Sequence, residues 1–228
     1  MTHGPRAVEG QNSQLIKLSL AEKLKEEIIQ GRLAPGQRII EGLWAKKFGA
    51  AQASVREAIN LLIGEGFATK ASGRSARVTC YSEDDLAQLY ELRGALEGLA
   101  ARLVVLRQPD LTPLETALQE MRIATKQGNT QSLVEADLHF HFALADLSGN
   151  RFLRTEIATL LVPLFAFVSI RVVQLHQTAQ AWEADLDRHR LVIDIIKEGD
   201  PIAAEFAVRD TIQQFSIRAY KIWRGIKP

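Results

Sequence analysis

The stretch QASVREAINLLIGEG, residues 52–66, decides the fold of the N-terminal part of the chain. Its apolar residues recur at helical spacing, and the pattern ends at Gly64, since glycine commonly stops a helix. A second face carries polar side chains at intervals of four residues: Gln52, Arg56 and Asn60. Because residues four apart share one helical face, the stretch predicts a helix from about residue 53 with one buried face and one polar face.

The segments around this helix predict a winged helix-turn-helix. Apolar residues at helical spacing run from residue 15 to residue 29, and a shorter helix is predicted over 41–48. After the third helix, residues 67–71 and 76–80 read as two short strands joined by a polar turn. Three helices, the last two separated by a tight turn, followed by a two-stranded hairpin are the elements of this fold in their order.

Beyond Ser82 the pattern is helical throughout, which predicts a second domain. The expected helices span residues 83–107, 112–127, 130–147, 150–175, 178–198 and 200–224. No strand signal follows Cys80, so these segments predict an antiparallel all-helical bundle of about six helices. The predicted fold class is therefore mostly α, with a mobile tail over 1–13, the winged helix-turn-helix with its two-stranded wing over 14–80 and the bundle over 83–224.

Composition and charge place the chain among globular proteins. Of its 228 residues, 46% are hydrophobic and 24% are charged, which argues against disorder and fibrous folds. Residues 1–78 hold 12 Lys and Arg against 7 Asp and Glu; the chain totals of 28 and 27 leave 16 against 20 for the remainder. The N-terminal part thus has an excess of five positive charges, which hints at a polyanionic partner.

Cysteine usage and hydropathy indicate a cytoplasmic protein without a membrane partner. A single cysteine, Cys80, cannot form an intramolecular disulfide, and residues 1–6 lack the apolar run of a secretory signal. The longest apolar stretch, Ile157 to Ile170, contains Pro163 and is shorter than the roughly 20 residues that cross a bilayer. We therefore expect that stretch to be a buried helix.

Several spaced elements in the N-terminal part resemble one known family. Residues 31–39, Phe48-Gly49, residues 55–59, Leu62 and residues 65–67 together resemble the winged-helix domain of the GntR family of transcription regulators, over residues 18–80. The resemblance implies binding to double-stranded operator DNA. Independently, a recognition helix places long polar side chains in the major groove, where arginine grips guanine bidentately. Arg56 is placed for that contact; the alternative is a solvated residue paired with a neighbouring carboxylate.

Further candidates for DNA contact lie on the same helix and at the hairpin tip: Gln52, Ser54, Asn60, Gly73 and Arg74. Gln52 stands where the family usually has a second guanine-reading arginine, and because glutamine prefers adenine edges, the operator sequence stays open. At the tip, glycine allows close approach of the backbone and arginine suits a narrow minor groove. The alternative there is an ordinary polar turn.

The second domain carries its own resemblance. Residues 90–93, 96–97, 137–141 and 148–150, with Arg171, His189 and residues 199–200, resemble the all-helical FCD effector domain of the FadR-like subfamily. The match covers about 83–223, and six helices fit the VanR-like branch best. The resemblance implies a divalent metal held by one aspartate and three histidines, and a small carboxylate effector.

Spacing supports two of the four metal ligands that the family implies. Asp137 and His141 are four residues apart and share one helix face, whereas His139 points away. His189 fits the third ligand, and the family's fourth histidine falls on Thr211. Carboxylate and imidazole ligands suit zinc, manganese, iron or nickel. Three interpretations stay open: a three-ligand site completed by water, a site that has lost its metal, and a polar pair of Asp137 with His141.

Two arginines of the second domain are the candidates for effector binding. Arg93 and Arg171 each offer a fork of donors that matches a carboxylate. The alternative is an ion pair, for example between Arg93 and Glu97 one helical turn later.

Together these features predict a ligand-responsive transcription regulator, a repressor, that forms a homodimer through the helical domain. The dimer is expected because residues 157–170 are apolar nearly all round and one winged helix offers few phosphate contacts. The alternatives are a metal-dependent enzyme and a DNA-binding protein without an effector. We expect no enzyme, because the sequence shows no nucleophile motif and no general base at a fixed spacing.

Overall fold

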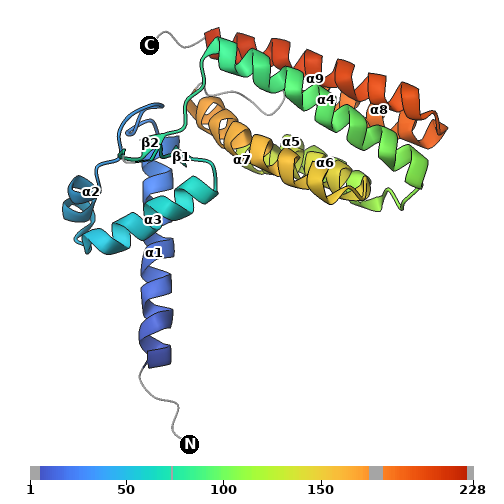
Figure 1. Cartoon of the computed structure of the whole chain (residues 1–228). Helices are drawn as coiled ribbons and strands as arrows, with labels where there is room; N and C mark the ends of the chain where they lie inside the picture. The colour runs from blue at the N-terminus through green and yellow to red at the C-terminus, as the bar shows by residue number, and fades with distance from the viewer. Residues whose placement is uncertain (1–5, 73, 175–181, 225–228) are drawn as a thin grey trace, which may run out of the picture. The chain divides into compact units, whose positions relative to one another are not determined.

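The computed structural model describes residues 6–72, 74–174 and 182–224, and divides the chain into two compact units (Figure 1). The first unit comprises Met1–Cys80 and the second Tyr81–Pro228. Within the described residues the structure has nine α-helices and one two-stranded antiparallel sheet. The mostly helical fold predicted from the sequence is therefore confirmed.

The first unit is a winged helix-turn-helix. Its elements are α1 (Arg6–Ile29), α2 (Glu41–Phe48), α3 (Gln52–Gly64), β1 (Ala68–Thr69) and β2 (Arg77–Val78). The predicted apolar stripe of α3 is buried: Val55, Ala58, Ile59 and Leu62. In the wing Ala68 pairs with Val78 and Thr69 with Arg77. Gly49 has φ 62° after α2, which allows the tight turn between α2 and α3.

The start of α1 differs from the prediction. Residues 6–13, predicted as part of a mobile tail, are helical, and α1 begins at Arg6. Once a helix is nucleated, each added residue contributes one further backbone hydrogen bond, so extension needs no apolar stripe. The polar composition of residues 6–13 gave no periodic signal for this extension. The core contribution of α1 comes from its second half, where Leu24 and Ile28 are fully buried.

The second unit is an all-helical bundle whose boundaries lie close to those predicted. Its helices are α4 (Glu83–Arg107), α5 (Thr112–Lys126), α6 (Thr130–Leu147), α7 (Arg151–Gln174), α8 (Glu183–Glu198) and α9 (Pro201–Arg224). A capping box explains the start of α4, because the Ser82 hydroxyl accepts from Asp85 N–H and the Asp85 carboxylate accepts from Ser82 N–H. One hydrophobic core lies between the helices.

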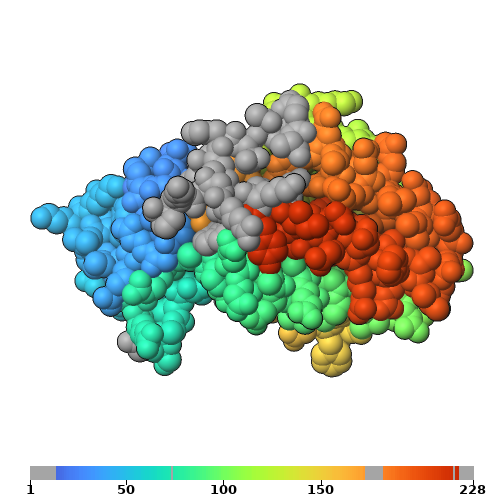
Figure 2. All heavy atoms as spheres, turned by 90° about the horizontal axis from the view of Figure 1, so that it is seen from above, coloured from blue at the N-terminus to red at the C-terminus, as the bar shows by residue number. Residues whose placement is uncertain are grey.

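Helices α4 and α9 lie side by side, as Figures 1 and 2 both show. Glycine on α4 allows this close contact. A Cβ atom added at Gly98 would lie 3.0 Å from Arg209 Cγ and 3.1 Å from the Glu205 carbonyl oxygen. Larger side chains at position 98 would therefore push the two helices apart.

Helix α7 contains the apolar stretch that the sequence predicted as a buried helix. By length and composition Arg151–Val172 could cross a membrane, but half of that window is buried inside the bundle, and Leu161, Leu164 and Ile170 are fully buried. Pro163 lies within this helix. Because proline has no backbone N–H, the carbonyl group one turn earlier, at Thr159, lacks its helical partner.

Candidate functional site

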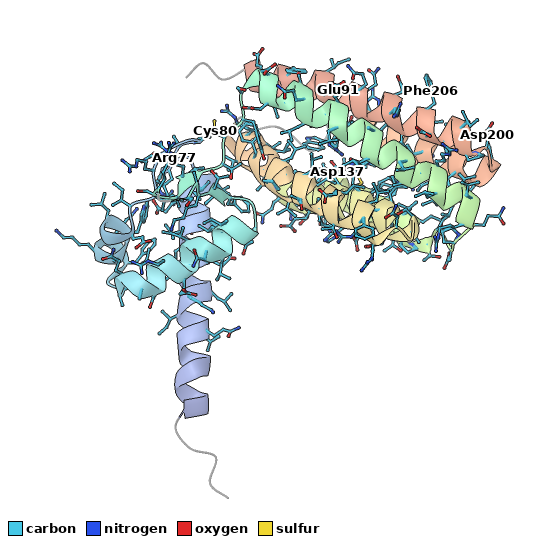
Figure 3. All side chains as sticks on the ribbon, viewed as in Figure 1. Arg77, Cys80, Glu91, Asp137, Asp200 and Phe206 are labelled. Carbon is cyan, nitrogen blue, oxygen red and sulfur yellow. The ribbon has the colours of Figure 1, made fainter. Side chains whose placement is uncertain are left out.

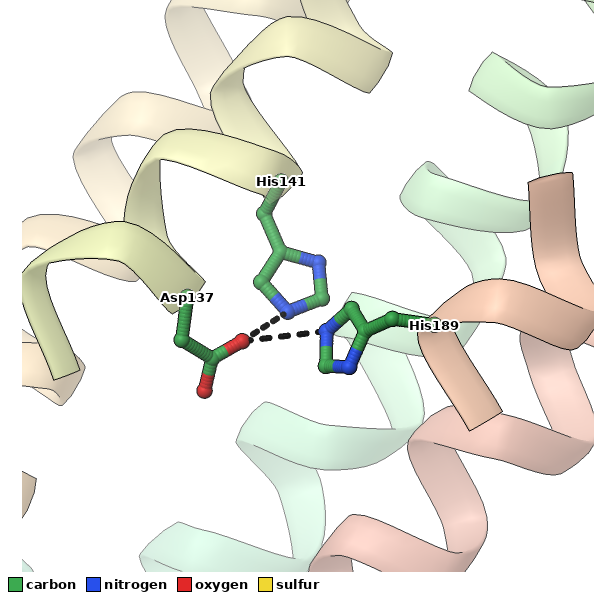
Figure 4. A group of neighbouring side chains, drawn as sticks. All are labelled: Asp137, His141 and His189. Carbon is green, nitrogen blue, oxygen red and sulfur yellow. Dashed lines mark ion pairs between the residues drawn. The ribbon is translucent and has the colours of Figure 1, made fainter. Parts of the chain in front are cut away.

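Three of the predicted metal ligands meet inside the bundle. Asp137 and His141 lie one turn apart on α6, and His189 comes from α8 (Figure 4). Asp137 Oδ1 lies 3.2 Å from His141 Nε2 and 3.1 Å from His189 Nε2. Ligand atoms bound about 2.1 Å from a tetrahedral metal are roughly 3.4 Å apart, so each nitrogen lies about as far from the carboxylate oxygen as a shared metal would require. The three ligand atoms all lie within 4.8 Å of one another. All three residues are buried.

The opposite nitrogen of each imidazole faces an acceptor. His189 Nδ1 lies 2.6 Å from the Asp185 carbonyl oxygen, which can only accept, so Nδ1 donates. His141 Nδ1 lies 2.5 Å from Glu97 Oε2. In the neutral rings both protons therefore sit on Nδ1, and both Nε2 lone pairs point towards Asp137. Metal-binding histidines have such acceptors behind them.

Asp137 Oδ1 and His189 Nε2 are buried atoms without a hydrogen bond among the described residues. A carboxylate oxygen facing an imidazole lone pair at 3.1 Å leaves two buried acceptors unsatisfied. A cation between them would satisfy both. The residues present therefore fit a divalent metal, and the interpretation of Asp137 and His141 as a self-sufficient polar pair fits these contacts less well.

Arg93 lies against the same cluster. Its Nε donates to Glu97 Oε1 at 2.6 Å, which is the ion pair that the sequence offered as an alternative. Its Nη2 lies 2.8 Å from His141 Nε2. Because arginine only donates, this contact also requires a lone pair on Nε2 of His141. Arg93 thus reaches the edge of the proposed metal position, while Thr211 is buried on α9.

Electrostatics make this cluster a site for positive charge. Burial raises the pKa of Asp137, but imidazoles of His141 and His189 that carry a proton on Nε2 outweigh it and hold that pKa well below its usual range. Burial also raises the pKa of Glu97, yet Arg93 and His141 lower it to about 2. Burial lowers the pKa of both imidazoles, but the charge of Glu97 outweighs it at His141 and raises the pKa of that ring, whereas the pKa of His189 stays lowered. The two carboxylates therefore favour one positive charge beside that of Arg93, and a divalent cation held by neutral imidazoles would supply it.

The cluster borders a pocket in the bundle. Together with its open mouth the pocket has an empty volume of about 630 Å³. Its walls are formed by Leu86, Tyr90, Arg93, Asp137, Phe165, Phe167, Val168, Arg171, Trp182, Asp185, Phe215 and Ala219. Both predicted effector-binding arginines therefore line one pocket. The aromatic wall of the pocket could not be predicted from the sequence, because the contributing residues come from different helices and show no shared spacing.

The polar end of the recognition helix forms a second candidate site. Arg56 Nε lies 3.1 Å and 3.2 Å from the two carboxylate oxygens of Glu41, and its Nη2 lies 3.0 Å from Oε2. Gln52 Nε2 donates to the same Oε2 atom at 3.3 Å. The Arg56 side chain is 54% exposed. This is the carboxylate pairing offered above as the alternative, and sequence analysis did not identify Glu41 as the partner.

The other predicted DNA contacts are accessible where the structure describes them. Asn60 and Arg74 are exposed and Ser54 is partly exposed, whereas Gly73 lies outside the described residues. Arg77 of the wing, labelled in Figure 3, is a further exposed arginine of this unit, and it donates to the Gly36 carbonyl oxygen at 2.8 Å.

Comparison with known proteins agrees with both units. The family described as "FCD domain" matches residues 88–214, and the family described as "Bacterial regulatory proteins, gntR family" matches residues 16–78. The uncharacterized HTH-type transcriptional regulator YdhC of Bacillus subtilis is 33% identical over 140 residues, which are 60% of this chain and 62% of YdhC. The alignment thus spans less than two thirds of that relative.

Two longer matches cover most of the chain. A probable D-xylose utilization operon transcriptional repressor of Paenarthrobacter nicotinovorans is 24% identical, covering 88% of this chain and 89% of that protein. The solved structure of McbR/YncC of Escherichia coli has a TM-score of 0.68 at 21% identity, covering 91% of this chain and 98% of that chain. The second match shows that the two proteins share a fold.

Proposed function

Because the chain belongs to the GntR family of transcription regulators and carries an FCD effector domain, we propose that it is a repressor released from its operator by a small carboxylate. The observation that carries this proposal is the cluster of Asp137, His141 and His189, whose Asp137 lines one pocket together with Arg93. A ligand held there would favour one arrangement of the winged helices over others and so change operator affinity.

The proposed site holds a divalent metal on Asp137, His141 and His189. The two acceptors behind the imidazoles support this assignment, since they turn both Nε2 atoms towards Asp137. Zinc, manganese, iron and nickel all suit these ligands. When bound, the metal would supply positive charge and a coordination position for a carboxylate, while Thr211 leaves the family's fourth ligand absent.

The effector is proposed to be a carboxylate with an apolar body. Arg93 and Arg171 provide the donors in the pocket, and each guanidinium also lies 5.3 Å from a phenylalanine ring, Phe165 or Phe167. Aromatic walls favour an apolar group, because they bury it without leaving polar atoms unsatisfied. A free acid with a short hydrocarbon or ring fits this combination.

Operator reading is assigned to α3 and the wing. Arg56 and Gln52 stand at the exposed N-terminal end of α3, which is the end that enters the major groove in this fold. Ser54, Asn60 and Arg74 are proposed as further contacts, and Gly73 is proposed from the sequence alone.

A homodimer is proposed as well, but on a different surface from the one expected. Many of the apolar residues between Ile157 and Ile170 are buried within the chain's own bundle, so we look for the interface elsewhere. Helix α4 instead exposes Leu92, Leu99 and Leu106 at seven-residue intervals, and the neighbouring α9 exposes Ile202 and Phe206. In Figure 3, Phe206 projects away from the bundle. A second copy is the proposed occupant of this apolar face, because a palindromic operator needs two winged helices.

The proposed setting is the cytoplasm, and no catalytic role is assigned. The relatives described above are transcription regulators. The cluster of Asp137, His141 and His189 has acceptors that orient its rings, but no nucleophile is proposed beside it.

A binding experiment tests the proposed function. Small carboxylates, with acetate and benzoate as probes of increasing apolar size, would be screened by thermal shift with and without added zinc. Acids that raise the melting temperature would then be titrated into the complex with operator DNA. The proposal expects metal-dependent stabilisation and release of DNA; stabilisation without any change in DNA affinity would contradict it.

A further inference from the structure

The contact between α2 and α3 points to a specificity-determining residue outside the recognition helix. We infer that Glu41 determines base preference by holding Arg56 and Gln52 in the orientations in which they read the operator. This inference rests on the proposed function, because it assumes that α3 enters the major groove. It concerns a residue that would not itself need to touch a base.

One carboxylate holds both reading side chains. Glu41 is the first residue of α2, and its Oε2 atom accepts from Arg56 Nη2 at 3.0 Å and from Gln52 Nε2 at 3.3 Å. Two side chains from successive turns of α3 are therefore fixed by a single group on the preceding helix. Hydrogen bonds from both donors also lower the pKa of Glu41, which keeps it ionised.

The contact leaves Arg56 the donors that guanine requires. Glu41 engages Nε and one proton of Nη2, which form the side edge of the guanidinium. Of the five N–H donors, both protons on Nη1 and the second on Nη2 stay available at the end of the side chain. A bidentate contact to O6 and N7 of guanine uses two such donors. Glu41 thus holds Arg56 so that the end of its guanidinium group faces the guanine base.

The same reasoning applies to Gln52. Donation to Glu41 identifies the amide nitrogen and fixes the rotation of the amide group. The second N–H and the carbonyl oxygen remain, and these are the donor and acceptor that pair with N7 and N6 of adenine. Both reading side chains are therefore prepared for a base by one acceptor.

Charge explains why this role is more than structural support. An exposed ion pair contributes little to folding stability, and Arg56 is 54% exposed. A carboxylate near the phosphate backbone also weakens general attraction to DNA. The charge of Glu41 therefore weakens binding to DNA of every sequence. By orienting Arg56 and Gln52, Glu41 at the same time favours the sequence that these two residues read, so specificity is gained at the expense of affinity.

The test compares four proteins on one random-sequence duplex library: the wild type, Glu41→Gln, Glu65→Gln and Glu41→Gln with Arg56→Ala. Glu65 is the matched control, because it follows the other end of α3 and pairs with Lys25 at 3.1 Å. Its substitution removes the same charge from the same unit. Selected sequences give base preferences, and titration with unselected duplex gives general affinity.

We expect Glu41→Gln to weaken preference at the guanine and adenine positions together, by roughly fivefold or more at each. Both glutamine variants should bind unselected duplex slightly more tightly, because each loses a negative charge. In the Arg56→Ala background, Glu41→Gln should change only the adenine position. The Glu65→Gln variant should select the wild-type sequence.

Three results would overturn the inference. One is an unchanged consensus in Glu41→Gln. Another is a lowered melting temperature with equal loss of affinity for all sequences, which would mean a structural role. If the wild type itself selects no consensus, the proposed operator reading fails and the inference falls with it. Should Glu41→Gln not fold, Glu41→Asp keeps the charge with a shorter reach and is expected to lose preference without gaining general affinity.

Discussion

Nδ1 of His141 lies 2.5 Å from Oε2 of Glu97, and the other oxygen of that carboxylate accepts from Arg93. One glutamate on α4 therefore supports both a proposed metal ligand and a proposed effector anchor. A change in the position of His141 would therefore affect Arg93 through this carboxylate, and a change in the position of Arg93 would affect His141. Glu97 is buried, so water cannot replace it in either contact.

Shortening this glutamate should weaken metal binding. In Glu97→Asp the charge beside Arg93 remains, but the carboxylate withdraws from His141 by one methylene. Loss of an acceptor behind a ligating histidine typically lowers metal affinity about 10-fold to 100-fold. Competition with a chelator would measure this change. Glu115→Asp, in an exposed pair with Lys197, is the control and should leave affinity unchanged; equal affinities in all three proteins would contradict the role of Glu97.

Removing the charge of Glu97 should destabilise the bundle and alter its response to acid. Glu97→Gln leaves Arg93 buried beside a neutral amide, and breaking a buried pair in this way costs about 3–5 kcal/mol. Since folding lowers the pKa of Glu97 from 4.5 to about 2, its contribution is present above pH 4.5 and is lost as pH falls towards 2. Urea unfolding of the variant should show a shallower loss of stability over that interval. An identical acid response in both proteins would argue against the pair.

Thr211→His should add the missing metal ligand. With three protein ligands, the wild type is expected to hold metal weakly and to lose it during dialysis against a weak chelator. An added imidazole on α9 should raise the retained metal towards one ion per chain. Elemental analysis after dialysis decides the matter. Tight, equal metal content in both proteins would show that position 211 is not the missing ligand, and no metal in either would favour binding by the arginines alone.

Arg56→Ala should remove specific operator binding without affecting the fold. Loss of a bidentate base contact is expected to lower operator affinity about tenfold or more in each half-site. Arg32→Ala is a matched control, because Arg32 is also about half exposed and pairs with Glu27 at 3.1 Å in the same unit. Fluorescence anisotropy with operator and unrelated duplexes would separate the effects. Equal losses of operator affinity in Arg56→Ala and Arg32→Ala would mean that only the positive charge of Arg56 matters, which would contradict the proposed base contact.

A charge on the exposed face of α9 should break the proposed dimer. In Phe206→Glu a carboxylate replaces a ring that is 73% exposed in the single chain, and burying it against a second copy would be unfavourable. Phe152→Glu is the control, since Phe152 on α7 is 68% exposed but lies outside the proposed α4–α9 face. Light scattering at micromolar concentration should find the first variant monomeric and the second dimeric. If both variants remained dimeric, the α4–α9 face could not be the dimer interface.

Helix positions could be predicted from the sequence because local residues mark the ends of most helices. Glycine and proline mark most of the breaks, and α4 and α6 begin and end where the pattern placed them. Asp137 and His141 were recognisable because a spacing of four residues puts them on one face. The ion pair of Arg93 with Glu97 has the same spacing and could likewise be foreseen as an alternative.

Contacts between helices could not be predicted in this way. Glu97 and His141 are on different helices, and no periodicity relates a carboxylate on one to a ring nitrogen on the other. The same holds for Glu41 and Arg56, whose contact depends on the turn at Gly49. The surface that forms a dimer could not be predicted for a related reason. An apolar helix surface is equally suited to its own bundle and to a partner, and only packing distinguishes the two.

Pro163 lies in α7, which forms one wall of the pocket, and makes this helix easier to bend. The missing hydrogen bond at Thr159 lowers the resistance of α7 to bending at a point just before Phe165 and Phe167. Helices α4 and α9 also contribute residues to the pocket, and they are in close contact at Gly98, where an added Cβ atom would lie 3.0 Å from Arg209 Cγ. A ligand that enters the pocket would therefore contact α7, which can bend at Pro163, and α4 and α9, which pack closely against each other. We expect the resulting motion to occur along α7.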